Sequence, residues 1–258
     1  MRKNATNGDA RIRRFHPARI IEHWVHVATF GVLACTGLAQ KFYTLDISQW
    51  MILLLGGIDR VRLIHRFTGL LCLLGVAVHI GVAIIGIVWK RWQPAMVITK
   101  MDFSNLIHNL RYYLGVESLP ARDDRYTYKQ KFEYWGILTG ILLMIGSGLI
   151  LWFPVLVARI LPGELIPTAK VLHTNEAMVI LLIISIWHIY NALFSPEVFP
   201  LDTSIFTGTL PRERMLKEHR LELAALEGRP VEELESDQTV KEKNLPAMPG
   251  ALEKNENV

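Results

Sequence analysis

The chain has 258 residues, of which 51% are hydrophobic and 20% are charged, and its mean hydropathy is +0.26. Its net charge of +4 is small, and nothing in the distribution of Lys and Arg supports nucleic-acid binding. Apolar residues are concentrated in four blocks, each long enough as a helix to cross about 30 Å of hydrocarbon. The blocks are Ile20–Gln40, Leu63–Trp89, Glu133–Phe153 and Val171–Phe194. We therefore expect an all-α integral membrane protein, a four-helix bundle embedded in the lipid bilayer.

In chain order, the sequence predicts a basic N-terminal arm (1–19), a four-helix transmembrane domain (20–200) and a C-terminal tail (201–258). The last part of the tail is rich in Glu, Lys, Asn and Pro, a composition typical of disorder, so we expect the tail to be partly disordered.

The distribution of positive charge predicts the orientation of the four helices in the membrane. Of 28 Lys and Arg residues, six lie in residues 1–19, eight in 90–131 and eight after Phe194. Because cytoplasmic segments carry an excess of Lys and Arg, both termini and the 90–131 connection should be cytoplasmic. The connections 41–62 and 154–170 should then lie on the outer side.

The two cysteines exclude two kinds of redox centre. Cys35 and Cys72 both lie inside apolar blocks, and there is no C-x-x-C-H motif for covalent haem attachment. The chain also lacks the cysteine cluster that an iron–sulfur centre needs.

Six of the nine histidines lie within or at the start of the apolar blocks: His23, His26, His65, His79, His173 and His188. An ionisable residue in hydrocarbon is costly and is by default a candidate functional residue. For a single histidine, the alternative is a neutral ring that is hydrogen-bonded across the bundle.

The spacing of four of these histidines favours haem binding. His65 and His79 are 14 residues apart and His173 and His188 are 15 apart. At about 100° per residue, each pair returns to within about 40–60° of one helix face, separated by about 21–23 Å. The second and fourth predicted helices, which carry these pairs, both run from the outer side inward. His65 should therefore lie at the depth of His173, and His79 at the depth of His188. This arrangement predicts axial ligands for two stacked haem b groups.

Small residues on the same faces leave room for a flat macrocycle. Gly69 is four residues after His65, and Gly75 is four residues before His79. Both glycines therefore lie on the histidine face, between the two levels.

The spacing does not decide which histidines bind the inner haem, the one nearer the cytoplasm. His23, His79 and His188 lie at similar depth, whereas a haem takes only two axial ligands. His26 lies one turn deeper, where it could contact a haem propionate or a quinone, or be an ordinary hydrogen-bonded histidine.

Three segments surround histidines of the apolar blocks: Arg19–Trp24, Arg62–Arg66 and His188–Tyr190. They resemble the cytochrome b (gamma) subunits of membrane formate dehydrogenases, and the wider group of four-helix di-haem cytochromes. The resemblance covers roughly residues 15–210. It implies that haem iron is held by His23 with His188 and by His65 with His173. The additional His79 and the 15-residue spacing are closer to the cytochrome b/b6 pattern, which would pair His79 with His188 instead.

The resemblance also implies a quinone site beside the inner haem, near the segment that enters the third helix. The residues at these positions are Tyr126, Thr127, Gln130 and Lys131. Gln130 and Lys131 match the family, whereas Thr127 and Lys129 stand where it usually has Asn and Gly. The substrate would be menaquinone or ubiquinone.

By this resemblance, the chain is a subunit of a larger oxidoreductase complex in a bacterial inner (plasma) membrane. It would pass electrons between a periplasmic redox partner and the quinone pool, either reducing quinone as in formate dehydrogenase or oxidising quinol toward a c-type cytochrome. The partners would be a catalytic oxidoreductase subunit and a periplasmic iron–sulfur or multihaem cytochrome c subunit. They would dock on connections 41–62 and 154–170. A different class of function is a proton- or metal-handling transporter, or a membrane anchor, without haem.

Overall fold

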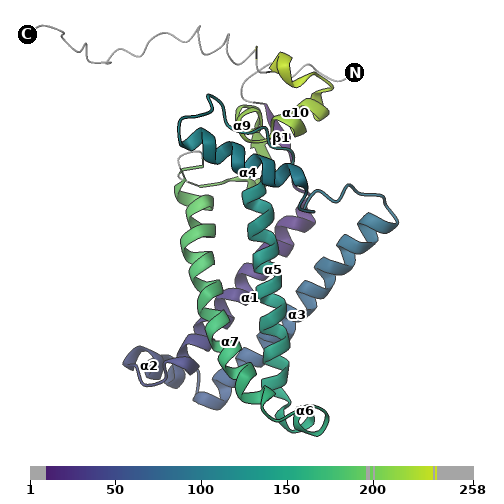
Figure 1. Cartoon of the computed structure of the whole chain (residues 1–258). Helices are drawn as coiled ribbons and strands as arrows, with labels where there is room; N and C mark the ends of the chain where they lie inside the picture. The colour runs from purple at the N-terminus through teal and green to yellow at the C-terminus, as the bar shows by residue number, and fades with distance from the viewer. Residues whose placement is uncertain (1–9, 196–197, 200, 235, 237–258) are drawn as a thin grey trace, which may run out of the picture. The chain divides into compact units, whose positions relative to one another are not determined.

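The computed structural model describes residues 10–195, 198–199, 201–234 and 236. Most of them are helical, and four long helices dominate (Figure 1): α1 (Pro17–Lys41), α3 (Ile58–Val88), α5 (Tyr128–Trp152) and α7 (Leu165–Leu182). α1 packs against α3, and α5 packs against α7. Two shorter helices, α2 (Asp46–Leu54) and α6 (Pro154–Ile160), lie in the connections that follow α1 and α5. The four predicted helices are therefore present, each beginning a little earlier than its apolar block.

The chain divides into two compact units. The first contains Met1–Thr99 and Tyr128–Arg212, and thus all four long helices. The second contains Lys100–Thr127 and Glu213–Val258. The polar connection after α3 and the tail, which are far apart in the sequence, therefore share one unit.

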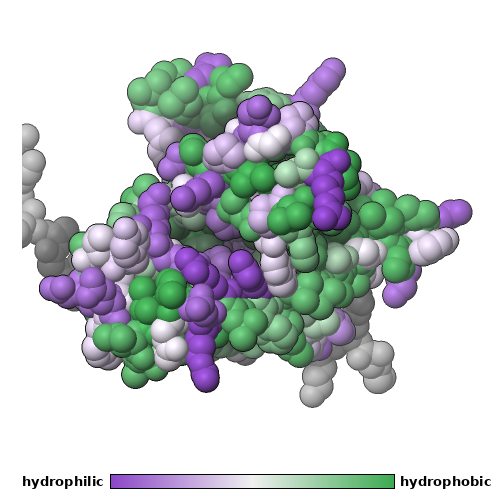
Figure 2. Space-filling model, turned by 90° about the horizontal axis from the view of Figure 1, so that it is seen from below, coloured by the Kyte–Doolittle hydropathy of each residue, from purple (hydrophilic) through white to green (hydrophobic). Residues whose placement is uncertain are grey.

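Three helices of the described residues are long and apolar enough to cross a membrane: Ile58–Val88, Tyr128–Trp152 and Leu165–Phe194. At most 11% of the residues in their most apolar windows are buried inside the protein, so most of their surface is available to lipid. Figure 2 shows hydrophobic residues over much of the face that it presents, between clusters of hydrophilic ones. The sequence predicts four spans. α1 has 25 residues but is less apolar than the other three, because charged and hydroxyl side chains interrupt it.

The third span changes its helical geometry along its length. After α7, the chain continues through two π-helical segments, η1 (Ile183–His188) and η2 (Tyr190–Phe194). Because a π turn contains more residues than an α turn, the direction of His188 differs from the one that 100° per residue predicts.

A two-stranded antiparallel sheet ties the N-terminal arm to the chain that follows the last span. β1 (Arg11–Arg13) pairs with β2 (Thr209–Pro211), and Nε of Arg11 donates to Oγ1 of Thr209 at 2.9 Å. Gly208 precedes β2 at φ +71°, and a Cβ there would lie 2.6 Å from the carbonyl oxygen of Phe15. Only glycine fits this left-handed turn without strain.

The start of α1 is held to the same region. The indole Nε1 of Trp24 donates to the carbonyl oxygen of Ile205 at 3.0 Å, and its ring stacks on Phe206 with centroids 5.0 Å apart. Both partners lie in α8 (Ser204–Thr207). Trp24, which follows His23 in the sequence, is therefore held by contacts with α8.

The second unit is built from α4 (Lys100–Tyr113), most of α9 (Arg212–Glu218) and α10 (Arg220–Glu227). Its buried apolar residues include Met215, Leu223 and Leu234. Arg125 pairs with Glu222 at 2.9 Å, and His219 Nδ1 donates to the carbonyl oxygen of Asp124 at 3.1 Å. The tail therefore has packed structure up to residue 234, while the predicted disorder falls mainly on residues outside those described.

Candidate functional site: paired histidines between the helices

The first histidine pair joins α3 to α7. The rings of His65 and His173 lie edge-on to each other at a centroid distance of 6.3 Å, with an angle of 75° between their planes. The two residues are 108 positions apart in the chain, and each comes from a helix that qualifies as a membrane span. We call them the His65–His173 pair.

The hydrogen bonds of this pair determine which ring nitrogen carries the proton. Nδ1 of His65 lies 2.8 Å from Oγ1 of Thr36, whose single hydrogen is directed to the carbonyl oxygen of Val32 at 2.6 Å. The hydroxyl must therefore accept a hydrogen from Nδ1 of His65, because a carbonyl oxygen can only accept. Nε2 of His65 is then left with a free lone pair, the form that binds a metal.

The same arrangement recurs at His173. Its Nδ1 lies 3.0 Å from Oγ of Ser147, and that hydroxyl donates to the carbonyl oxygen of Leu143 at 2.7 Å. Ser147 therefore accepts from Nδ1, and Nε2 of His173 is free as a ligand atom. Thr36 lies on α1 and Ser147 on α5, so four helices build one pair.

The second histidine pair joins α1 to η1. The rings of His23 and His188 lie at a centroid distance of 6.3 Å, with 43° between their planes. Nδ1 of His188 donates to Oε1 of Glu133 on α5 at 2.7 Å. Nδ1 of His23 is buried and has no hydrogen-bond partner among the described residues. We call these residues the His23–His188 pair.

His79 is not part of a histidine pair. Its Nδ1 contacts Oε1 of Glu22 at 2.5 Å, and its Nε2 lies 2.8 Å from the hydroxyl of Tyr134. The other oxygen of Glu22 pairs with Arg19 at 2.6 Å. A chain of polar groups, Arg19–Glu22–His79–Tyr134, thus links α1, α3 and α5.

The two predicted glycines, Gly69 and Gly75, lie against α1. A Cβ on Gly75 would lie 3.2 Å from Nε2 of His26, and one on Gly69 would lie 4.0 Å from Leu33. The glycines nearest the His65–His173 pair are instead Gly37 and Gly148, where a Cβ would lie 3.4 Å and 3.2 Å from the two rings. His26 itself bonds the backbone of its own helix, with Nδ1 2.8 Å from the carbonyl oxygen of Glu22.

The two pairs are suited to hold a haem iron. Imidazole nitrogen binds a metal such as Zn²⁺ at about 2.0–2.1 Å, so two histidines on opposite sides of one metal have ring centroids about 6 Å apart. Both pairs have this separation. Histidine is a common axial ligand of haem iron. In the part of the chain that the structure describes, no group of three or more His, Cys, Asp or Glu forms a metal cluster.

The residues predicted to contact quinone fall in both units. Gln130 and Lys131 lie in the first turn of α5, where Lys131 is buried, whereas Tyr126 and Thr127 belong to the second unit. Tyr134, the partner of His79, lies on α5 one turn after Gln130 and Lys131.

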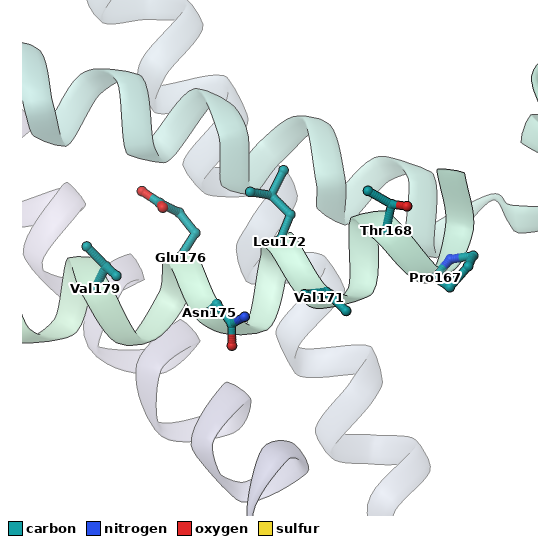
Figure 3. A pocket seen from close by; sticks show the side chains of 7 residues that line it. All are labelled: Pro167, Thr168, Val171, Leu172, Asn175, Glu176 and Val179. Atoms are coloured by element: carbon teal, nitrogen blue, oxygen red, sulfur yellow. The ribbon is translucent and has the colours of Figure 1, made fainter. Parts of the chain in front are cut away.

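A hollow of about 560 Å³ lies elsewhere, along α7. Figure 3 shows that its seven lining residues all come from this helix, with Glu176 and Leu172 pointing toward the neighbouring helix. Glu176 reaches Gly140 on α5, where a Cβ would lie 2.9 Å from its carboxylate oxygen. No histidine of either pair lines this hollow.

Sequence reasoning missed the groups that orient the histidines. The hydroxyls of Thr36 and Ser147 carry no signal in the sequence, because such residues commonly bond their own helix backbone. Glu22 and Glu133 could have been found, since a carboxylate next to or within an apolar block is itself a candidate functional residue.

Histidines that are paired across apolar helices are suited to hold haem in a membrane cytochrome. Comparison with known proteins agrees with this class. The chain is 24% identical to the cytochrome b556(Fdn) subunit of the nitrate-inducible formate dehydrogenase of Escherichia coli over 172 residues, which are 67% of this chain and 73% of that subunit. It is 26% identical to the cytochrome b556(fdo) subunit of E. coli formate dehydrogenase over 189 residues, 72% and 80% of the two chains.

A third relative is the cytochrome b556 subunit of formate dehydrogenase from Haemophilus influenzae, 27% identical over 201 residues, 75% of this chain and 76% of that one. No protein-family model matches the chain. The chain is thus a homologue of formate dehydrogenase cytochrome b subunits, which confirms the resemblance that its histidine-bearing segments indicate.

Proposed function

We propose that the chain is a membrane di-haem cytochrome b that passes electrons between a redox partner and the quinone pool. The observation that carries this proposal is the presence of two histidine pairs with the same centroid separation of 6.3 Å. The cytochrome b556 relatives support haem b as the cofactor. Haem supplies one-electron redox chemistry, which the protein's side chains alone do not provide.

In this proposal, His65 with His173 holds one haem iron and His23 with His188 holds the other. Thr36 and Ser147 keep the rings of the first pair in the tautomer that leaves Nε2 free, and Glu133 does the same for His188. Such partners of ligand histidines fix both the ring orientation and the basicity of the ligand.

We further propose that α1 is the fourth span, because it carries His23 and Thr36. Its sides also expose apolar residues of the kind that face lipid, including Ile21 and Val25. Polar groups on a span are accommodated where they face the bundle interior, as His23 does toward His188. With four spans, the clustering of Lys and Arg supports a cytoplasmic location for both termini.

The proposed quinone site lies at the start of α5, in a bacterial inner membrane. Gln130 and Lys131 would contribute from α5, whereas Tyr126 and Thr127 precede this helix in the sequence and belong to the second unit. The hydrogen-bonded His79 and Tyr134 support this location, because they add polar groups one turn further along the same helix. Menaquinone and ubiquinone both carry the carbonyl oxygens that such groups can bind.

The proposed partners are a catalytic oxidoreductase subunit and a periplasmic iron–sulfur or multihaem cytochrome c subunit. The formate dehydrogenase relatives support a catalytic partner. The docking surface would be the outer connections, which contain α2 and α6. Both directions of electron flow, toward quinone or from quinol, use the same residues.

A visible spectrum tests the central proposal. The purified protein should show a reduced b-type spectrum, and a pyridine haemochrome assay should return two haems per chain. A transporter or anchor that uses its histidines for protons or metal would show no Soret band. One haem or none in the assay would therefore contradict the proposal.

A further inference from the structure

The two histidine pairs differ in the chemical groups that are hydrogen-bonded to their Nδ1 atoms. Both rings of the His65–His173 pair donate to neutral hydroxyls, on Thr36 and Ser147. In the His23–His188 pair, the partner of His188 is a carboxyl group, that of Glu133, at 2.7 Å. This contact is the shortest of the three. The two haem sites that the chain would build are therefore electrostatically unequal.

The carboxyl group of Glu133 is shielded from solvent. Its side chain is 14% exposed, and it comes from the first turns of α5 to a ring that η1 carries. A carboxylate in this position forms a charge-assisted hydrogen bond, which is stronger than one to a hydroxyl. It attracts the Nδ1 hydrogen, makes the imidazole a stronger electron donor at Nε2, and so favours the oxidised, more positive iron.

We infer that Glu133 is a positioning residue that acts through His188 and lowers the reduction potential of the haem held by the His23–His188 pair, leaving the other haem unaffected. This inference rests on the proposed di-haem function and deepens it. By this inference, the Glu133 side chain sets the difference in reduction potential between the two haems. That difference determines the free-energy change of electron transfer from one haem to the other.

The test is a redox titration of the purified, haem-loaded protein. The variant is Glu133→Gln, which keeps the size and the hydrogen-bond acceptor but removes the charge. The matched control is Ser147→Ala, which removes an Nδ1 partner from the other pair. A His65→Ala background removes the haem of the His65–His173 pair, so the remaining titration wave belongs to the His23–His188 pair.

We expect Glu133→Gln to raise the midpoint potential of one haem only, and the same wave to be raised in the His65→Ala background. Ser147→Ala should leave that wave in place and change only the other. Glu133→Asp, which restores the carboxylate, should return the potential toward that of the wild type.

Three results would overturn the inference. They are equal shifts of both waves, no shift in either wave, or loss of one haem in both Glu133→Gln and Glu133→Asp, since Glu133 would then be needed to hold haem rather than to adjust it. Failure of the proposed function is a separate result. A wild-type protein without haem would give no titration wave at all, whereas two haems with unchanged potentials would contradict only the role of Glu133.

Discussion

Thr36 on α1 and His65 on α3 are joined by a hydrogen bond of 2.8 Å, in which the hydroxyl accepts from Nδ1 because its own hydrogen goes to the carbonyl oxygen of Val32. One side chain thus fixes the orientation and the tautomer of a ring on another helix. Thr36 is 3% exposed, so water does not replace it readily.

Thr36→Val should weaken haem binding at the His65–His173 pair by about 10–100-fold, the usual cost of losing a group that orients a ligand histidine. The rate of haem transfer to excess apomyoglobin measures this change. Thr29→Val is the matched control, because the Thr29 hydroxyl is also buried but bonds carbonyl groups of its own helix. Equal rates of haem transfer in the two variants would contradict the role of Thr36 in orienting His65.

His65→Ala and His173→Ala should each lower the haem content from two to one per chain. The two pairs share no residue, so the other haem should remain, with an unchanged absorption band. Pyridine haemochrome content and low-temperature spectra of the reduced protein measure the outcome. Loss of both haems from a correctly inserted protein would show that the two sites are not independent.

His23→Ala and His79→Ala should separate the two schemes for the second haem. The ring centroids of His23 and His188 are 6.3 Å apart, whereas His79 is hydrogen-bonded to Glu22 and Tyr134. We therefore expect His23→Ala to lose one haem. His79→Ala should retain both but slow quinone turnover, because a group beyond the ligands changes affinity or potential without releasing haem. The opposite pattern would favour the cytochrome b/b6-like pairing of His79 with His188.

The topology prediction concerns α1 as the fourth span. A reporter that is active only in the periplasm should be inactive when fused to either terminus and active when inserted after Leu161, in the connection that follows α6. If α1 lies outside the bilayer, the chain has three spans and its termini lie on opposite sides, so the reporter would be active at one of them. Activity at either terminus would therefore contradict the predicted topology.

The amino-acid sequence alone determined the long helices and the two depths of the histidines. Helix length and apolar content are local properties, and depth along a helix follows from a rise of about 1.5 Å per residue. His65, His79, His173 and His188 could therefore be assigned to levels without knowledge of packing. The segments around His23, His65 and His188 were also sufficient to identify the resemblance to formate dehydrogenase cytochromes.

Only the tertiary structure decided which rings meet. His23, His79 and His188 share one predicted depth, but contact between their rings depends on how α1, α3 and η1 are rotated and cross. No sequence period encodes that rotation. His188 is the last residue of a π-helical segment, so a uniform α-helical period does not predict its direction. Thr36, Ser147 and Glu133 each lie on a different helix from the histidine that they orient. Such a partnership is a property of packed helices, because side chains distant in the sequence become neighbours only when the bundle forms.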